Sequence, residues 1–335
     1  MKTKKHIEFG SLATHRGFLG KPPLSWKVAP FPCDAKEVFL TQVAGLMKRL
    51  KAIGCCDCVV GLSGGLDSTL VLLVVFAAFR KLKFDLNGIH VYTMPGFGTT
   101  KRTKSNAEIL ATDLGLKIET ISIVKACQQH FRDIGHDGQT PDVTFENAQA
   151  RMRTMILMDK ANMTGGIVLG TGDMSEVALG WCTYNGDHMS MFGVNAGVPK
   201  TVVRKVCAWW AATHTRSYPK ASQAINDIIA TPISPELIKG QVTEDKLGSY
   251  ELHDFFLWNF IVNEMGSRDL ESAAKEHFGD RFTAAEIRRT LKTFLHRFFT
   301  QAFKRNCAPD GIKVFPFELS LHDWWIPSDL GLVKI

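Results

Sequence analysis

Residues 61–68 read GLSGGLDS, a glycine-rich and polar stretch that stands between two apolar segments. Glycines let backbone N–H groups approach an anion closely, and the N-terminus of a following helix favours negative charge. Ser63, Ser68 and Thr69 add hydroxyl donors. The stretch therefore predicts a turn that binds phosphate. It differs from the common P-loop, because Leu66 and Asp67 stand where that motif has a lysine.

The negative charge of Asp67 is unexpected inside a turn that binds phosphate, because phosphate is also negatively charged. A carboxylate is compatible with phosphates when a cation lies between them, so Asp67 is a candidate ligand for Mg²⁺. The alternative is an ordinary strand-to-helix loop in which aspartate and serine only cap the helix.

Strand-like and helix-like segments alternate around this turn. Apolar runs predict strands at 56–63, 88–94, 117–124 and 166–172, and helical spacing predicts helices at 34–54, 66–82, 103–115 and 144–165. Continuous apolar strands separated by helices indicate a parallel sheet that is covered on both faces. We therefore expect a doubly wound α/β core, in which ligands bind beyond the carboxyl ends of the strands.

The character of the chain changes near residue 231. Helices are predicted at 242–266 and 283–306, the second with a capping box from Thr283 to Glu286. Its apolar stripe consists of Ile287, Leu291, Phe294, Leu295, Phe298 and Ala302. The expected organisation is a lead-in over 1–35, an α/β core over 36–230 and a helical C-terminal extension over 231–335.

Composition narrows the class of protein. The chain has 335 residues, is 45% hydrophobic and carries a net charge of +7, which suits a folded protein with an anionic partner such as a nucleotide. No basic region typical of nucleic-acid binding stands out. The longest apolar run, Leu70 to Phe79, is too short to span a membrane, and no apolar segment follows the charged N-terminus, so the expected location is cytoplasmic.

The eight cysteines are expected to be free thiols, since Cys55, Cys56 and Cys58 lack a second ligand pair for a metal.

The motif SGGLDS resembles the loop of the ATP-pyrophosphatase superfamily, whose members cleave ATP between its α- and β-phosphates. Three further stretches, 145–154, 169–187 and 194–201, together look like an NAD synthetase. The stretches 94–107, 243–256 and 298–314 are similar to the synthetase portion of glutamine-dependent NAD synthetases. The likeness covers roughly residues 36–330.

The resemblance implies a reaction and its substrates. Deamido-NAD is adenylated by ATP with Mg²⁺, pyrophosphate leaves, and ammonia then displaces AMP to give NAD. The glutamine-dependent enzymes also carry an N-terminal glutaminase, for which the residues before 36 are too few. The chain is therefore expected to use free ammonia or a separate glutaminase, unless it is a fragment. A homodimer is a further expectation from the resemblance.

The resemblance also implies which residues form the site. The expected metal ligands are Asp67 and Glu176, and Asp187 is expected near the reacting carboxylate or the ammonia. The expected ATP-binding residues are Gly61, Leu62, Ser63, Gly64, Gly65, Leu66, Asp67, Ser68, Thr171 and Lys200. The expected deamido-NAD contacts are Asn147, Arg151, Glu176, Trp181, Cys182, Thr183, Tyr184 and Lys304, with Arg305 beside the last.

Several of these assignments have plainer alternatives. Asn147 and Arg151 are four residues apart, so both can face one ligand, although such residues also occur as surface groups. Trp181 could pack in the core, and Lys200 could be a surface charge. Around Trp325 the sequence SLHDWWIPSD departs from the family pattern, in which arginine stands at that position.

Two other functions remain open from the sequence. A tRNA-modifying member of the superfamily would share the loop, but it should carry a separate basic region. A nonenzymatic nucleotide-binding relative would bind ATP without releasing pyrophosphate.

Overall fold

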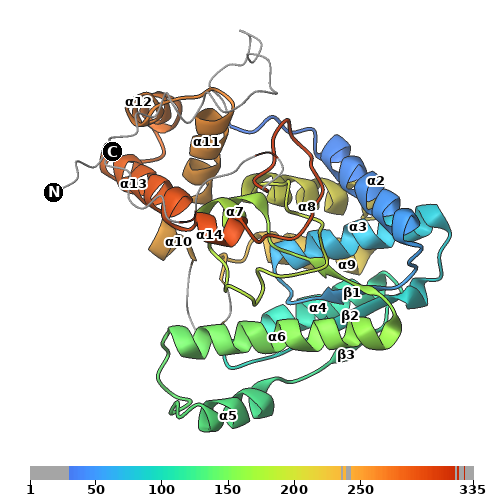
Figure 1. Ribbon diagram of the computed structural model, residues 1–335. Coiled ribbons are helices and arrows are strands. Elements are labelled where there is room, and N and C mark those ends of the chain that lie inside the picture. Colours follow the sequence, from blue (N-terminus) through green and yellow to red (C-terminus); the bar gives the residue numbers. More distant parts are fainter. Residues whose placement is uncertain (1–29, 235–236, 239–242, 321–322, 324–327, 329–335) are drawn as a thin grey trace.

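The computed structural model describes residues 30–234, 237–238, 243–320, 323 and 328. Its centre is a five-stranded sheet in the order β3-β2-β1-β4-β5 (Figure 1). The strands are β1 (Cys58–Gly61), β2 (Ile89–Thr93), β3 (Ile118–Thr120), β4 (Ile167–Gly170) and β5 (Phe192–Gly193). All neighbouring strands are parallel. The chain moves outward from β1 to β3 and then returns to the other side of β1, so the order reverses between β1 and β4.

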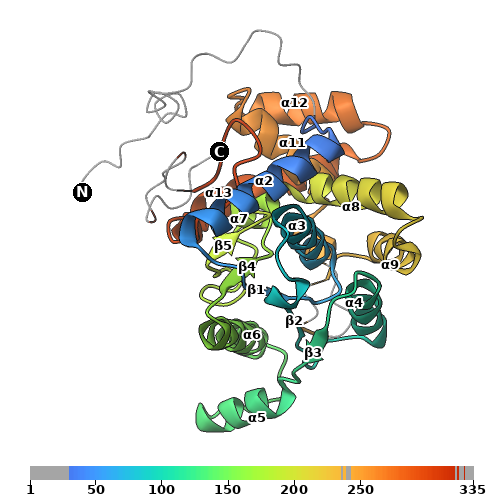
Figure 2. The same ribbon diagram turned by 90° about the vertical axis from the view of Figure 1, so that its right-hand side faces the viewer.

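Both faces of the sheet are buried. Val59 points into a smaller apolar core on one face, while Cys58 and Val60 point into a larger core on the other, as the alternation of a strand requires. The smaller core is covered by α5 (Val124–Asp133) and α6 (Val143–Thr164), seen on one side of the strands in Figure 2. The other side is covered by α2 (Ala35–Ile53), α3 (Leu66–Leu82), α4 (Lys101–Asp113), α8 (Lys200–His214) and α9 (Pro219–Ile229). The predicted doubly wound α/β fold is confirmed.

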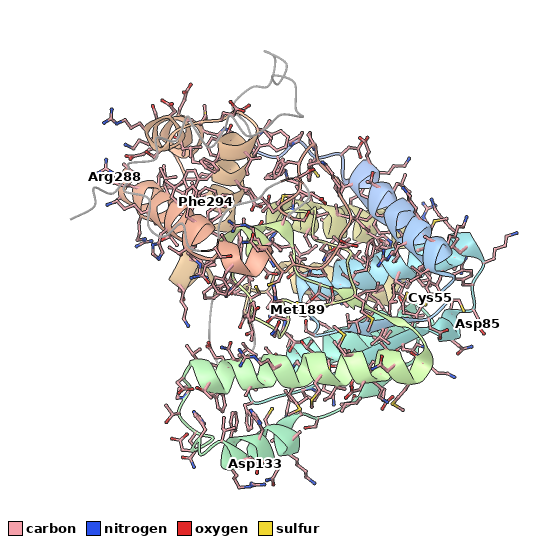
Figure 3. All side chains as sticks on the ribbon, viewed as in Figure 1. Cys55, Asp85, Asp133, Met189, Arg288 and Phe294 are labelled. Atoms are coloured by element: carbon pink, nitrogen blue, oxygen red, sulfur yellow. The ribbon has the colours of Figure 1, made fainter. Side chains whose placement is uncertain are left out.

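A helical layer lies beyond the end of the sheet that carries β4 and β5. It contains α10 (Thr243–Leu247), α11 (Tyr250–Ile261), α12 (Ser267–Phe278), α13 (Ala284–Thr300) and α14 (Ala302–Arg305), and it packs on α7 (Met174–Leu179). The capping box between Thr283 and Glu286 is present, as predicted. The predicted apolar stripe of α13 is buried. Figure 3 shows Phe294 turned toward the interior of this layer and Arg288 extending away from it.

The structure corrects three predicted elements. The strand predicted at 117–124 pairs only over Ile118–Thr120, because Val124 already begins α5. The helix predicted at 242–266 is broken at Gly248, whose φ of 91° ends α10 before Ser249 caps α11. The helix predicted at 283–306 is likewise two, since the chain leaves helical geometry at Gln301.

Other elements were not predicted, or lie outside the described residues. The sequence patterns did not indicate α5, α8, α9, α12, the 3₁₀ turn η1 (Leu86–Gly88) or the two-residue strand β5. Most of the lead-in and the departure at Trp325 lie outside the described residues. Within the described ranges, no helix has both the length and the apolar character that a membrane crossing needs.

Candidate active site

The turn between β1 and α3 is shaped by its own serines. Ser63 Oγ accepts the N–H of Gly65 at 3.1 Å, and the Ser68 hydroxyl donates to the carbonyl of Gly65 at 3.1 Å. Gly64 has a φ of 86°, and a Cβ there would lie 2.1 Å from the carbonyl oxygen of Thr103 in α4. Only glycine fits at this position, because a side chain would be strained and would also clash.

An ion cluster lies directly beside this turn. The ammonium of Lys200 is 2.6 Å from Asp67 Oδ2, 2.7 Å from Asp173 Oδ2 and 2.9 Å from Glu176 Oε1. Lys200 is only 1% exposed and Asp173 is fully buried. Asp67 comes from the first turn of α3, Asp173 and Glu176 from the start of α7, and Lys200 from the start of α8. We call these four residues the acidic centre.

Local sequence explains how α7 presents its acids. Asp173 caps the helix by accepting the N–H of Glu176 at 2.8 Å, and a Glu176 carboxylate oxygen accepts the N–H of Asp173 at 3.3 Å. This reciprocal capping box fixes both backbones. The remaining carboxylate oxygens can then face Lys200.

The acidic centre shifts the pKa of its members. Burial alone would lower the pKa of Lys200, but the carboxylates of Asp173, Asp67 and Glu176 raise it well above its usual value. Burial raises the pKa of Glu176 to about 7, with Lys200 opposing and Asp67 adding to the shift. Burial likewise raises the pKa of Asp173. One ammonium therefore does not balance three carboxylates near neutral pH, and additional positive charge would favour their ionised forms.

The donor set of the acidic centre fits a divalent cation. One ligand oxygen from each of Asp67, Asp173 and Glu176 can be chosen so that all lie within 4.8 Å of one another. Asp67 Oδ1 is buried and meets no hydrogen-bond donor among the described residues. Carboxylate oxygens are the ligands that Mg²⁺ prefers. The eight cysteines are free thiols, and among the described residues no group of cysteines and histidines converges in this way.

Two buried amides hold the loops around the acidic centre. Asn195 Nδ2 donates to the carbonyl of Asp67 at 3.0 Å and to the carbonyl of Thr171 at 3.2 Å. Gln42 of α2 donates to Asn195 Oδ1 at 3.0 Å. Both amide side chains are fully buried. They therefore tie the turn after β1 to the turn after β4.

A second group of predicted residues meets in the turn that follows α7. Thr183 donates its hydroxyl to Asn147 Oδ1 at 2.8 Å, and Asp187 Oδ1 accepts the N–H of Thr183 at 2.8 Å. The guanidinium of Arg151 donates to the carbonyl of Tyr184 at 3.2 Å. The start of α6 and this turn are thus held together.

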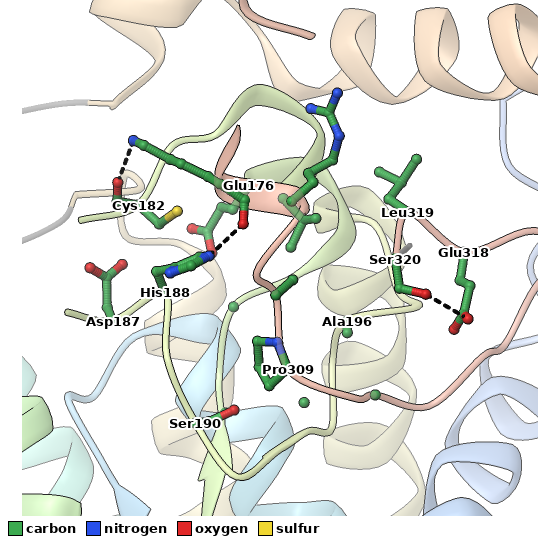
Figure 4. Close-up of a pocket in the computed structure, with 18 residues that line it drawn as sticks. Glu176, Cys182, Asp187, His188, Ser190, Ala196, Pro309, Glu318, Leu319 and Ser320 are labelled. Atoms are coloured by element: carbon green, nitrogen blue, oxygen red, sulfur yellow. Dashed lines mark hydrogen bonds between the residues drawn. The ribbon is translucent and has the colours of Figure 1, made fainter. Parts of the chain in front are cut away.

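A small pocket joins this turn to the acidic centre (Figure 4). Its volume is about 60 Å³ and its walls include Glu176, Cys182, Asp187, His188 and Lys304. Such a volume holds a few molecules of the size of water. Surrounding protein raises the pKa of Asp187, although solvent still reaches its side chain. Burial raises the pKa of the Cys182 thiol to about 12, so this thiol stays protonated.

The basic residues from α14 reach backbone carbonyls. Lys304 Nζ donates to the carbonyl of Gly180 at 2.8 Å and to that of Cys182 at 2.7 Å. Arg305 is 3% exposed and donates to the carbonyls of Ala178 and Phe298. Both side chains satisfy carbonyls at the end of α7 and nearby. The Lys304 ammonium, which has three donors, makes two such bonds and also lines the pocket.

Trp181 and Tyr184 differ in their surroundings. Trp181 is half-buried, with the guanidinium of Arg297 5.1 Å from its ring centroid. Tyr184 is 40% exposed and stacks on His188 at 5.5 Å. Tyr184 is thus the more exposed of the two rings.

Three residues that meet here were not singled out from the sequence. Asp173 could have been found from its capping-box spacing to Glu176. Asn195 lies within the stretch 194–201, but its contacts, like those of Gln42, are with segments distant in sequence.

Comparison with known proteins fits this geometry. Residues 38–304 match the NAD synthase family profile. The chain belongs to the NAD synthase family. It is 38% identical over 328 residues to the glutamine-dependent NAD(+) synthetase of Mycobacterium leprae, covering 89% of this chain and 48% of that protein. The chain thus spans about half the length of the curated relatives it matches.

Solved structures of this family share the fold. The glutamine-dependent NAD(+) synthetase of Cytophaga hutchinsonii superposes with a TM-score of 0.70 at 18% identity, over 88% of this chain and 54% of that one. The NH3-dependent NAD synthetase of Campylobacter jejuni superposes with a TM-score of 0.53 at 20% identity, over 82% of this chain and 96% of that one.

Proposed function

We propose that this chain is an NAD synthetase. It adenylates the nicotinate carboxylate of deamido-NAD with ATP, and ammonia then displaces AMP to give NAD. The observation that carries the proposal is the acidic centre beside the glycine turn, at the carboxyl end of β1. A phosphate-binding turn that borders three carboxylates and a buried lysine suits cleavage of ATP with loss of pyrophosphate.

Each part of the acidic centre has a role in that cleavage. The turn at 61–68 holds the phosphates through its N–H groups, and Thr171 contacts ATP from the end of β4. Asp67 and Glu176, with Asp173, hold Mg²⁺, which when bound neutralises the charge on phosphate oxygens. Lys200 stabilises the charge that develops on the pyrophosphate as it leaves.

Deamido-NAD occupies the region between α6 and the turn after α7. Asn147 and Arg151 contact the dinucleotide, and Trp181, Cys182, Thr183 and Tyr184 surround the nicotinate ring. Lys304 supports that turn through its carbonyls and lies at the edge of the same pocket. Ammonia reaches the activated carboxylate through this pocket, whose volume suits so small a nucleophile, and Asp187 lies beside its path.

A homodimer is part of the proposal. The exposed face of α6 carries Met155 and Met163, which are 53% and 77% exposed, and Arg151 and Tyr184 lie near the same surface. These exposed apolar side chains are available for contact with a second copy of the chain. The proposed location is the cytoplasm, where ATP is available.

The deciding experiment measures pyrophosphate and NAD formed by the purified chain with ATP, Mg²⁺ and deamido-NAD, comparing ammonium with glutamine. We expect NAD with ammonium. NAD with glutamine alone would require glutaminase activity within this chain. A mononucleotide substrate lacking the adenosine half serves as a control for recognition of the dinucleotide.

Matched variants identify the site within this assay. Asp67→Asn at the carboxyl end of β1 should abolish pyrophosphate release, whereas Asp57→Asn before the same strand, where Asp57 pairs with His90, should leave the activity near that of the wild type. ATP binding without pyrophosphate release in the wild type would favour a nonenzymatic relative. Adenylation of a tRNA would favour the nucleic-acid-modifying alternative.

A further inference from the structure

Helix α11 belongs to the C-terminal helical layer, yet one of its side chains bonds residues that adjoin the acidic centre. Asp254 is 1% exposed, and its Oδ2 accepts the N–H of Thr201 at 2.9 Å and the Thr201 hydroxyl at 2.6 Å. Its other oxygen accepts the hydroxyl of Ser175. Ser175 Oγ in turn accepts the N–H of Lys200 at 2.8 Å. One carboxylate therefore joins the first turn of α7 to the first turn of α8.

These contacts replace a missing cap. The residue before α8 is Pro199, which makes no side-chain capping bond. The first N–H groups of a helix need acceptors, and a negative charge is favourable there. Ser175 and Asp254 supply both for Lys200 and Thr201. The position of α8 relative to α7 is set by this linkage.

The same face of α11 also supports the Lys200 side chain. Tyr250 lies one turn before Asp254, is 2% exposed, and has its ring centroid 5.4 Å from the Lys200 ammonium. Thus α11 supports the backbone of Lys200 through Asp254 and its ammonium through Tyr250.

We propose that Asp254 is a positioning residue, which holds Lys200 of α8 at the correct distance from Glu176 of α7 for the adenylation step. This inference rests on the proposed function. It assigns to the C-terminal helical layer a direct part in the geometry of the acidic centre. A capping residue that only stabilises the fold is the competing explanation.

Kinetics separate positioning from stability. Asp254→Asn keeps the shape of the side chain but replaces one acceptor oxygen with a donor, and we expect kcat to fall about 10- to 100-fold while KM for ATP changes less than about threefold. The control is Phe255→Leu, the next residue on α11, whose ring packs on His277 and Phe278 of α12. It should lower the melting temperature at least as much and leave kcat near the wild-type value. An equal loss of kcat in both variants overturns the proposal.

A double-mutant cycle tests the linkage itself. Ser175→Ala removes the acceptor for Lys200 N–H, so Ser175→Ala combined with Asp254→Asn should lose little more kcat than the worse single variant. If the kcat losses of the two single variants multiply in the double variant, Ser175 and Asp254 act independently and the proposed linkage is overturned. If Asp254→Asn fails to fold, Thr201→Val, which removes only the hydroxyl bond, should give the same kinetic signature with a smaller loss.

A chemical readout is independent of the activity. Buried Lys200 should react slowly with an amine-reactive reagent, measured by peptide mass spectrometry against exposed Lys83 in the same chain. Asp254→Asn should speed the labelling of Lys200 severalfold, and Phe255→Leu should not. Unchanged labelling overturns the positioning role even if NAD forms. Faster labelling in a chain that makes no NAD would overturn the proposed function and leave the structural linkage intact.

Discussion

The ammonium of Lys200 and Oδ2 of Asp67 lie 2.6 Å apart, although 133 residues separate the two positions in the chain. Asp67 lies in the first turn of α3 and Lys200 begins α8, so two helix N-termini converge on one ion pair. The pair is part of a buried group with three carboxylates, in which removal of the one cation leaves uncompensated charge.

Lys200→Met should therefore destabilise the protein in a pH-dependent way. We expect a loss of about 3–5 kcal/mol in the free energy of unfolding near pH 8. The loss should shrink near pH 5.5, because Asp173 and Glu176 already have raised pKa values and take up protons there. Urea denaturation at both pH values measures the difference. Lys205→Met, at an exposed position of the same helix, should change little at either pH; a Lys200→Met loss that does not depend on pH would contradict this account.

Gly64→Ala should remove nucleotide binding with only a local change in structure. The new Cβ would lie 2.1 Å from the Thr103 carbonyl at a φ of 86°, so the turn must move away from α4 and its N–H groups lose their arrangement. Isothermal titration with ATP measures the effect. Gly115→Ala is the control, because Gly115 also has a positive φ, 74°, but its Cβ would meet open space. If Gly115→Ala impaired ATP binding equally, strain elsewhere rather than the clash in the turn would be responsible.

The sequence predicted those parts of the fold that depend on local pattern. The apolar runs at β1, β2 and β4 and the capping signal of α13 specify their elements almost alone, so these predictions were confirmed. Strand β5 has only two residues, and α8 begins after Pro199 without a side-chain cap, so neither leaves a strong local signal. Gly248 was overlooked because a helical pattern continues on both sides of it.

The candidate site divides in the same way. Asp67 was proposed from its own turn, and Glu176 and Lys200 were proposed from stretches that resemble the family. The burial of Lys200 could not be predicted, since it depends on three elements meeting beyond the sheet. Asn195 lies within the stretch 194–201, but its bonds to the carbonyls of Asp67 and Thr171 could not be read from that stretch. Contacts between buried polar groups of distant segments require the tertiary structure.

Asp173→Asn should weaken metal binding without unfolding α7. Asparagine caps a helix as well as aspartate does, so the N–H of Glu176 keeps its acceptor, whereas one of the three carboxylates is lost. We expect at least a tenfold higher Mn²⁺ concentration for half-saturation in the presence of a nonhydrolysable ATP analogue, measured by titration calorimetry. Asp142→Asn, at the N-cap of α6, should leave the affinity unchanged. An unaltered affinity in Asp173→Asn would exclude Asp173 as a ligand.

Asp254 gives a prediction for the pH dependence of stability. Burial raises its pKa to about 6, against hydrogen bonds from Ser175 and Thr201 that lower it. Because the folded-state pKa exceeds the unfolded value, the stability linked to this group is full below pH 4 and is lost as the pH rises through 6. Asparagine does not ionise. The stability of Asp254→Asn relative to the wild type should therefore improve between pH 4.5 and pH 8, as melting temperatures would measure.

Asp227 provides a control of opposite sign for this pH test. Hydrogen bonds from Arg102 and Asn106 lower the pKa of Asp227 to about 2, so its contribution to stability is present above pH 4 and is lost as the pH falls toward 2. Asp227→Asn should therefore lower the melting temperature most near neutral pH and least in acid. If both variants changed with pH in the same direction, the general charge of the protein, rather than the burial of Asp254 beside the acidic centre, would control the dependence.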